Sequence, residues 1–94
     1  MAKVNINFIG LWRVIVGLGT VTVEVNSVDE ARDYVEMNYG PLYRKWLRFG
    51  TGQTNQSVWE NCNVLLNGKG LKGSEDMNLK DGDHLDLVPR VAGG

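Results

Sequence analysis

The chain closes with LKDGDHLDLVPRVAGG, residues 79–94, and this stretch decides the fold. Its Asp81-Gly82-Asp83 segment is typical of a tight turn, because glycine adopts positive φ without a steric penalty and aspartate hydrogen-bonds to nearby backbone. In residues 84–88 two leucines share one face, as in a strand with one buried side. Pro89 has no N–H to give to a sheet and ends that strand. The sequence therefore predicts a last strand over residues 84–88 and a flexible extension over residues 89–94.

Two further alternating runs stand near the start of the chain. Val4, Ile6 and Phe8 point one way and their neighbours the other, and three valines alternate with threonine and glutamate over residues 20–26. Such β-branched alternation is typical of strands, and two short runs this close predict an antiparallel hairpin. Between them, residues 10–19 hold apolar side chains among three glycines, which is too irregular for a strand. We interpret this segment as a packed turn.

A helix is expected after the hairpin. Ser27 and Glu30 have the spacing of a capping box, and apolar side chains then recur at helical spacing up to Tyr39. Gly40-Pro41 is a stop signal, because glycine favours the end of a helix and proline lacks the N–H that would extend it. The pattern predicts a helix over residues 28–39, with one or two further turns over residues 42–47. Polar residues 50–57 are expected to form a mobile loop.

The remaining strands follow that loop. Cys62, Val64 and Leu66 alternate with their neighbours up to Asn67-Gly68, a pair typical of a tight reversal, and Leu71 fits a short edge strand beyond it. A hairpin and later strands around one amphipathic helix indicate an α+β fold with a mixed sheet of four to five strands, covered on one face. We expect residues 1–88 to form a single domain, with residues 89–94 as its C-terminal tail.

Length, charge and cysteine content exclude several classes of protein. The chain has 94 residues, enough for one small core, and its net charge of -1 argues against nucleic acid as a partner. Its single cysteine, Cys62, excludes a disulfide framework, and also a four-thiolate metal site unless a second chain supplies ligands. We expect no bound metal or cofactor. No stretch approaches a membrane span or a secretory signal. The expectation is a cytoplasmic protein without a membrane partner.

The terminal Gly93-Gly94 pair allows two interpretations. One is a frayed end or a cloning remnant. The other is that the carboxylate of Gly94, ionised at neutral pH, attacks an α-phosphate to form an acyl adenylate. Glycines would then let the end enter a nucleotide site, since a Cβ limits approach. The six residues from Pro89 onward reach at most ~20 Å, long enough to enter such a site while the domain docks outside it.

The sequence resembles the small sulfur carriers related to the molybdopterin synthase small subunit and the thiamine-pathway carrier. The resemblance lies in residues 6–17, 63–68, 79–83 and 87–94, and its most specific part combines the Asp-Gly-Asp turn, the last strand and the terminal glycines. It implies a ubiquitin-like β-grasp fold, with the first and last strands parallel at the centre. Arg90 departs from the molybdopterin branch, which often has a second proline there.

The resemblance also implies a function and its partners. A ubiquitin-activating-type enzyme would use ATP to adenylate Gly94, a sulfur donor protein would convert it to a thiocarboxylate, and the sulfur would be donated in cofactor biosynthesis, with molybdopterin favoured. A synthase large subunit is a further expected partner. The chain would be a cosubstrate without catalytic side chains, and tail residues Arg90, Val91, Ala92 and Gly93 would give Gly94 access to the enzyme.

Other functions remain open from the sequence. The same carboxylate would serve a ubiquitin-like modifier conjugated to lysines, or a carrier for thiamine, cysteine or tRNA thiolation. A plain binding module with an inert tail is a third hypothesis. An intact mass of the cellular protein separates them, because thiocarboxylate and lysine-linked adducts differ in mass.

Strand alternation also predicts a docking surface. Ile9, Leu65 and Val88 are expected to face away from the helix, on strands that the β-grasp order makes neighbours. Three apolar residues gathered beside the tail favour an interface for the adenylating enzyme. Cys62, by contrast, is expected to be a buried structural thiol and His84 a surface residue.

Overall fold

The computed structural model describes residues 2–50, 57–71 and 78–89. The tail from Arg90 to Gly94 and most of the predicted loop over residues 50–57 lie outside the described residues. Predictions about them therefore stay predictions.

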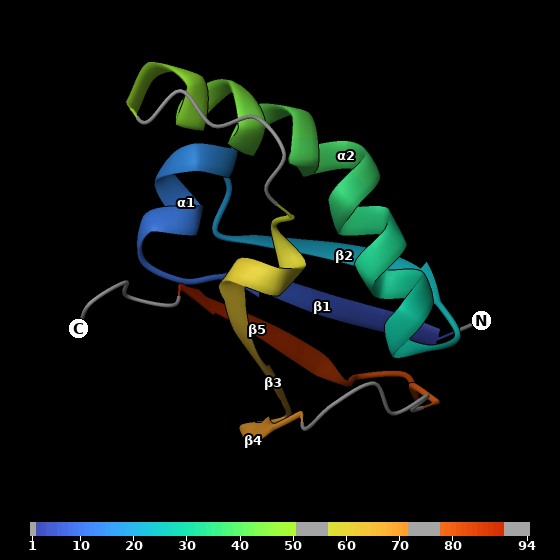
Figure 1. The fold of residues 1–94 in the computed structure, drawn as a ribbon. Helices are drawn as coiled ribbons and strands as arrows, with labels where there is room; N and C mark the ends of the chain where they lie inside the picture. Colours follow the sequence, from blue (N-terminus) through green and yellow to red (C-terminus); the bar gives the residue numbers. More distant parts are fainter. Residues whose placement is uncertain (1, 51–56, 72–77, 90–94) are drawn as a thin grey trace.

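One mixed sheet forms the base of the molecule. Its strands are β1 (Ala2–Phe8), β2 (Thr20–Val25), β3 (Cys62–Leu66), β4 (Lys69–Gly70) and β5 (His84–Pro89). They lie in the order β2-β1-β5-β3-β4, with β1 and β5 parallel and the other pairs antiparallel (Figure 1). This confirms the predicted hairpin, the α+β class and the parallel pairing of the first and last strands. The last strand includes Pro89, one residue beyond its predicted end.

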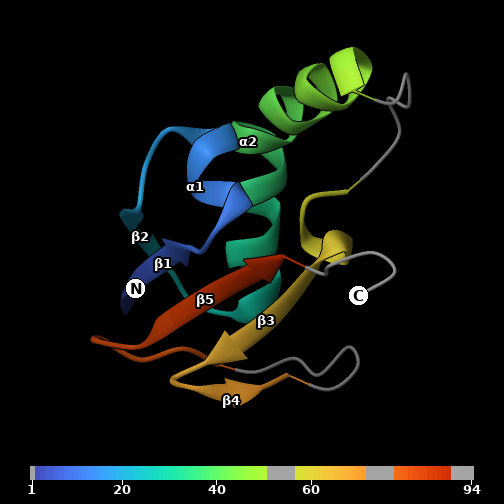
Figure 2. The same cartoon turned by 90° about the vertical axis from the view of Figure 1, so that its left-hand side faces the viewer.

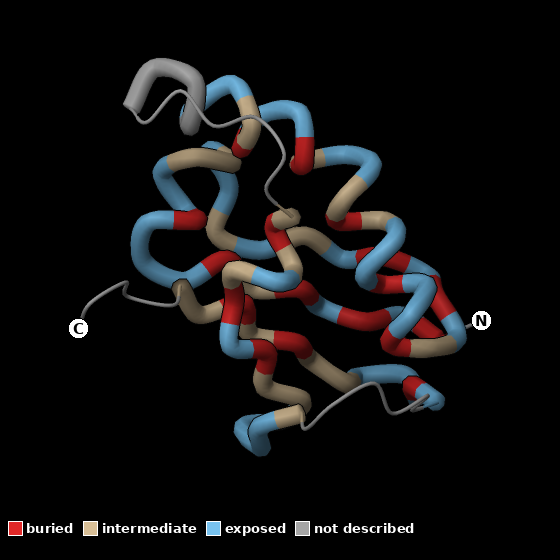
Figure 3. Tube along the Cα trace, viewed as in Figure 1, coloured by how far each residue is buried: buried red, intermediate tan, exposed pale blue. Residues whose placement is uncertain are grey.

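Both α-helices lie over one face of the sheet. They are α1 (Leu11–Val16) and α2 (Val28–Gly50), and a short 3-10 helix, η1 (Trp59–Asn61), leads into β3 (Figures 1 and 2). Buried and less buried residues alternate along the strands (Figure 3), and the buried ones form the core together with residues of these helices. The largest fully buried side chains are Phe8, Ile6, Leu85, Leu87, Val4, Val35 and Val58. The opposite face of the sheet carries no described helix.

The prediction that Gly40-Pro41 ends the helix is wrong. The helix α2 runs through Pro41 to Gly50 as one element, and it includes the region that was expected to form separate turns. Proline removes one backbone hydrogen bond and costs a helix about 3 kcal/mol. Tyr43, two residues later, is buried and packs edge-on against Trp12 of α1, with ring centroids 4.6 Å apart. We attribute the continuation to this tertiary contact, which rewards helical geometry beyond the proline.

The packed turn predicted over residues 10–19 contains a helix. The helix α1 has six residues and is followed by Gly17. The φ of Gly17, 84°, is the left-handed conformation that glycine adopts readily at a helix end. Trp12 is almost fully buried, and this anchors α1 against α2. The segment is packed as expected, but its local structure is helical.

The predicted turns and the helix start are confirmed. Asn67 and Gly68 both have positive φ, 51° and 86°, as a two-residue hairpin turn requires, and β4 follows them directly. The Glu30 N–H donates to Ser27 Oγ at 3.2 Å, which satisfies one of the free donors at the start of α2.

Candidate functional site

The root of the tail lies at the end of β5, close to the centre of the sheet. Pro89 is paired with Cys62 at the start of β3. On its other side lies Gly10, where a Cβ would come 3.6 Å from Cγ of Pro89. The Ile9 N–H donates to the Leu87 carbonyl at 3.1 Å, which joins the end of β1 to β5. The tail therefore starts from a point fixed by three segments of the chain.

The predicted docking residues flank this root on the open face of the sheet. Leu87, between Asp86 and Val88, is fully buried, whereas Val88 is half-buried and lies opposite Asn63 of β3. Leu65 is also half-buried and lies opposite Asp86, one diagonal step from Val88. Ile9 follows β1 and is 41% exposed. The structure thus places all three away from the core and on neighbouring segments, and we refer to Ile9, Leu65 and Val88 as the apolar patch.

A row of polar side chains crosses the same face, and strand alternation within single segments did not single it out. The Thr20 Oγ1 hydroxyl donates to Asn7 Oδ1 at 2.8 Å, and Asn7 Nδ2 donates to Asp86 Oδ1 at 2.7 Å. A parallel contact joins Thr22 Oγ1 to Asn5 Oδ1 at 2.7 Å. The row spans β2, β1 and β5 and ends at Asp86, directly opposite Leu65. The open face is therefore apolar around its edge near the tail and anionic at its middle.

The Asp-Gly-Asp turn holds the start of β5. Asp83 accepts hydrogen bonds from the Lys80 N–H at 2.8 Å and from Asn67 Nδ2 at 2.9 Å, while Asn67 Oδ1 accepts from the His84 N–H at 3.0 Å. The bond from Asn67 and then that from Lys80 lower the pKa of the Asp83 carboxyl, because both favour its ionised form. Asp81 accepts from the Lys3 N–H at 2.7 Å. These contacts tie the turn to β1 and to the β3–β4 turn.

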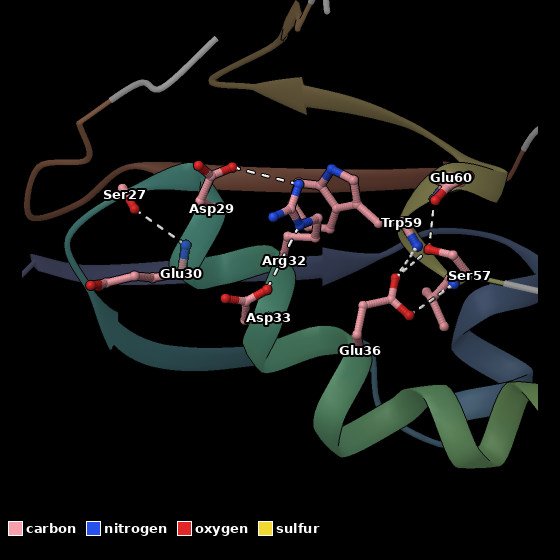
Figure 4. Close-up of polar contacts among 10 residues, drawn as sticks. Ser27, Asp29, Glu30, Arg32, Asp33, Glu36, Ser57, Trp59 and Glu60 are labelled. Carbon is pink, nitrogen blue, oxygen red and sulfur yellow. Dashed lines mark hydrogen bonds and ion pairs between the residues drawn. The ribbon is translucent and has the colours of Figure 1, made fainter. Parts of the chain in front are cut away.

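A second carboxylate anchors the segment that leads into β3. Glu36, on α2, accepts hydrogen bonds from Ser57 Oγ at 2.6 Å, from the Trp59 N–H at 2.7 Å and from the Val58 N–H at 3.2 Å (Figure 4). Ser57 Oγ in turn accepts from the Glu60 N–H at 3.2 Å. Glu36 thus caps η1 from a neighbouring helix and positions the strand that pairs with the tail root.

The remaining reactive side chains, Cys62 and His84, do not belong to a metal-binding cluster in the described part of the chain. Cys62 is buried as expected, and its Sγ lies 3.0 Å from the Val58 carbonyl, to which it donates. His84 is half-buried on the open face of the sheet. Within the described ranges, no three His, Cys, Asp or Glu side chains gather in a group that would hold a metal ion.

Comparison with known proteins identifies the family. The ThiS family model matches residues 8–94, a range that includes the central strand β5, the Asp-Gly-Asp turn and the two terminal glycines. The chain belongs to the ThiS family. This confirms its resemblance to the small sulfur carriers and their ubiquitin-like β-grasp fold.

Solved structures share the fold of this ThiS-family chain along nearly its whole length. Small archaeal modifier protein 1 from Methanosarcina acetivorans has a TM-score of 0.70 and 24% identity, with 100% of this chain and 98% of that one covered. A putative molybdopterin converting factor, subunit 1, from Pyrococcus furiosus has a TM-score of 0.68 and 18% identity, covering 97% and 100%. Subunits 1 and 2 of the molybdopterin-converting factor from Helicobacter pylori were solved as a complex, which matches with a TM-score of 0.61 and 23% identity, covering 98% and 99%.

Two further searches gave negative results. No curated protein matches the sequence of this ThiS-family chain. Of the helices in the described residues, none combines the length and the apolar character that a membrane crossing needs.

Proposed function

We propose that this chain is a sulfur carrier whose reactive group is the terminal carboxylate of Gly94. The observation that carries the proposal is the reach of the ThiS family match, which runs through the tail to Gly94. The fold supports it, because β5 leads from the centre of the sheet to a fixed root at Pro89. Residues 90–94 follow that root in the sequence and would bring Gly94 into a partner's nucleotide site.

The proposed chemistry takes place in the partner enzyme. A carboxylate oxygen of Gly94 attacks the α-phosphorus of ATP held by a ubiquitin-activating-type enzyme, and pyrophosphate leaves. A persulfide on a donor protein then attacks the acyl carbon and AMP leaves; a thiol cleaves the resulting acyl disulfide, which releases the thiocarboxylate and leaves a disulfide between that thiol and the donor. Gly93 gives the end its access, and residues 90–92 form the rest of the extension. The apolar patch docks the domain outside the nucleotide site, so that this chain contributes a substrate group and a recognition surface.

We further propose that the sulfur is used in molybdopterin synthesis, together with a synthase large subunit. Two of the structurally similar proteins are described as molybdopterin converting factor subunits, and one of them was solved with its subunit 2. A large subunit would use the same geometry as the activating enzyme, since it also has to receive the tail while the open face docks. Co-purification of the tagged chain with such a subunit from its source cells tests this assignment.

Deletion of Gly94 tests the central proposal. ATP–pyrophosphate exchange by the cognate adenylating enzyme should be abolished, while the unfolding midpoint stays unchanged because the residue lies beyond β5. Unchanged exchange with the shortened chain would refute the carrier proposal. Intact mass spectrometry of the cellular protein adds a direct test: the mass gained when sulfur replaces oxygen supports a carrier, and lysine-linked adducts would instead support the modifier.

A further inference from the structure

We infer that Asp86 is a specificity-determining residue of the open face, and that the adenylating enzyme presents an arginine or lysine side chain to it. The inference rests on the proposed function, because it assumes that the enzyme covers this face during activation of the tail. It adds what the partner surface must contain: a basic group surrounded by apolar surface that fits the apolar patch.

Asp86 has a central position on this face. It lies on β5 opposite Leu65 of β3 and opposite Asn7 of β1, and Val88 is the next residue on its strand that faces the same way. Pro89, the root of the tail, is three residues further on. Among the described side chains of the row through Thr20, Asn7, Asp86 and Leu65, the carboxylate of Asp86 carries the only formal charge. A partner that contacts the apolar patch therefore also covers this carboxylate.

The orientation of Asp86 is held by its neighbours. Asn7 Nδ2 donates to Asp86 Oδ1 at 2.7 Å, and Asn7 is itself held through Thr20 Oγ1 at 2.8 Å. Because the amide nitrogen faces the carboxylate and its oxygen faces the hydroxyl, the whole row has one consistent direction of donation. The second oxygen, Oδ2, has no hydrogen-bond partner among the described residues, and neither described ion pair involves Asp86. The free chain thus presents an oriented acceptor on a half-buried side chain of the open face.

Docking changes the environment of that acceptor. When the face is covered, Asp86 Oδ2 loses its water, and an ionised group buried without a partner is strongly unfavourable. The neighbours Leu65 and Val88 are apolar, and the other open-face neighbours, His84 and Asn63, make no described hydrogen bond to Asp86, so we expect the enzyme to supply the donor. A basic side chain is favoured over a neutral donor, because opposite charges attract more strongly once water is excluded. The same requirement disfavours partners with an apolar or acidic group at this point.

The Asp86→Asn substitution tests the inference, because it removes the charge and keeps the shape. We expect the KM for the carrier in ATP–pyrophosphate exchange to rise about tenfold with kcat unchanged, as for a weakened charge-assisted contact in docking. The KM should also depend less steeply on ionic strength. Asp33→Asn is the matched control: it removes the same charge from an exposed position on α2, behind the other face of the sheet, and should leave both quantities close to wild type.

Several results would overturn the inference. If the wild-type chain is adenylated and Asp86→Asn leaves KM and its salt dependence unchanged, Asp86 is not a docking residue and the carrier function stands. Equal effects of Asp86→Asn and Asp33→Asn would mean that only net charge matters. If the wild-type chain is not adenylated at all, the inference falls together with the proposed function. An unchanged urea midpoint shows that Asp86→Asn is folded, and if that midpoint falls, Asp86→Glu, which keeps the charge, should restore the KM.

Discussion

Replacing Glu36 with alanine should destabilise the fold more than substitutions at surface-facing helix positions usually do. Its carboxylate accepts from the backbone N–H groups of Val58 and Trp59 and from Ser57 Oγ, and Val58 is fully buried. The Ser57 hydroxyl can turn to water, but the two backbone donors lose their acceptor where the chain enters the core. Each unpaired buried donor costs about 1–3 kcal/mol, and because Trp59 is only half-buried we expect the lower part of the range for two donors, a loss of about 2–4 kcal/mol from Glu36→Ala. Glu36→Gln keeps one acceptor oxygen and should lose about 1–2 kcal/mol.

Urea denaturation followed by tryptophan fluorescence measures this loss. With a slope near 1 kcal/mol per molar urea for a domain of this size, Glu36→Ala should lower the midpoint by about 2 M or more, with an unchanged slope. Asp33→Ala, one turn earlier on α2, is the control: its contact with Arg32 is long, 3.8 Å, and exposed, so its effect should stay within about 0.5 kcal/mol. If Glu36→Ala also changes the free energy of unfolding by no more than about 0.5 kcal/mol, the argument that Glu36 anchors η1 is refuted.

Two further predictions concern the open face and the Asp-Gly-Asp turn. Val88→Asp should leave the chain folded but weaken docking by ~2 kcal/mol, which corresponds to roughly a 30-fold rise in the KM for adenylation. The double substitution Ile9→Asp with Leu65→Asp should have the same effect. Normal adenylation kinetics in both variants would show that the apolar patch is not part of the site. Hydrogen bonds from Asn67 and Lys80 lower the pKa of Asp83, so its carboxylate stabilises the fold above its unfolded pKa and loses this effect as the pH falls through the folded value. Asp83→Asn should therefore be less stable than wild type at neutral pH, and the urea midpoints of the two proteins should converge as the pH falls below about 4. A difference between the two midpoints that does not depend on pH would contradict the stabilising role of the ionised Asp83 carboxylate.

Local sequence signals predicted those parts of the fold whose geometry depends on few residues. The Asn67-Gly68 turn required two positive φ angles, and these two residue types adopt them readily. The alternation in β1, β2, β3 and β5 identified which residues are buried, because a strand has only two faces. The family resemblance then supplied the strand order, which alternation alone does not determine.

The errors arose where distant contacts outweigh local preference. Pro41 is a helix-breaking signal, but the packing of Tyr43 on Trp12 involves a segment about thirty residues away that no local pattern reveals. The helix α1 has only six residues, too few for helical spacing to be distinguished from a packed turn.

The polar part of the site depends on pairing between strands. Asn7 and Asp86 are 79 residues apart in the chain, and they meet because β1 and β5 are parallel in one particular register. Their positions on the open face follow from alternation, so the strand order together with that register was the missing information. The contact between Glu36 and η1 had no such signal, because it joins a helix to an irregular segment.

The parallel pairing of β1 with β5 also links the proposed reactive end to the integrity of the whole domain. The strand β5, which pairs with β1 at the centre of the sheet, is synthesised almost last. Until then, one edge of β1 in the β1–β2 hairpin has unpaired backbone groups. A chain cut before β5 would lose both its core strand and the tail attached to it. A truncated product would then lack the group that we propose is adenylated, whereas a chain that carries the tail also carries the strand that completes the sheet. Under the proposed function, synthesis errors that shorten the chain would be kept out of sulfur transfer without a separate proofreading step.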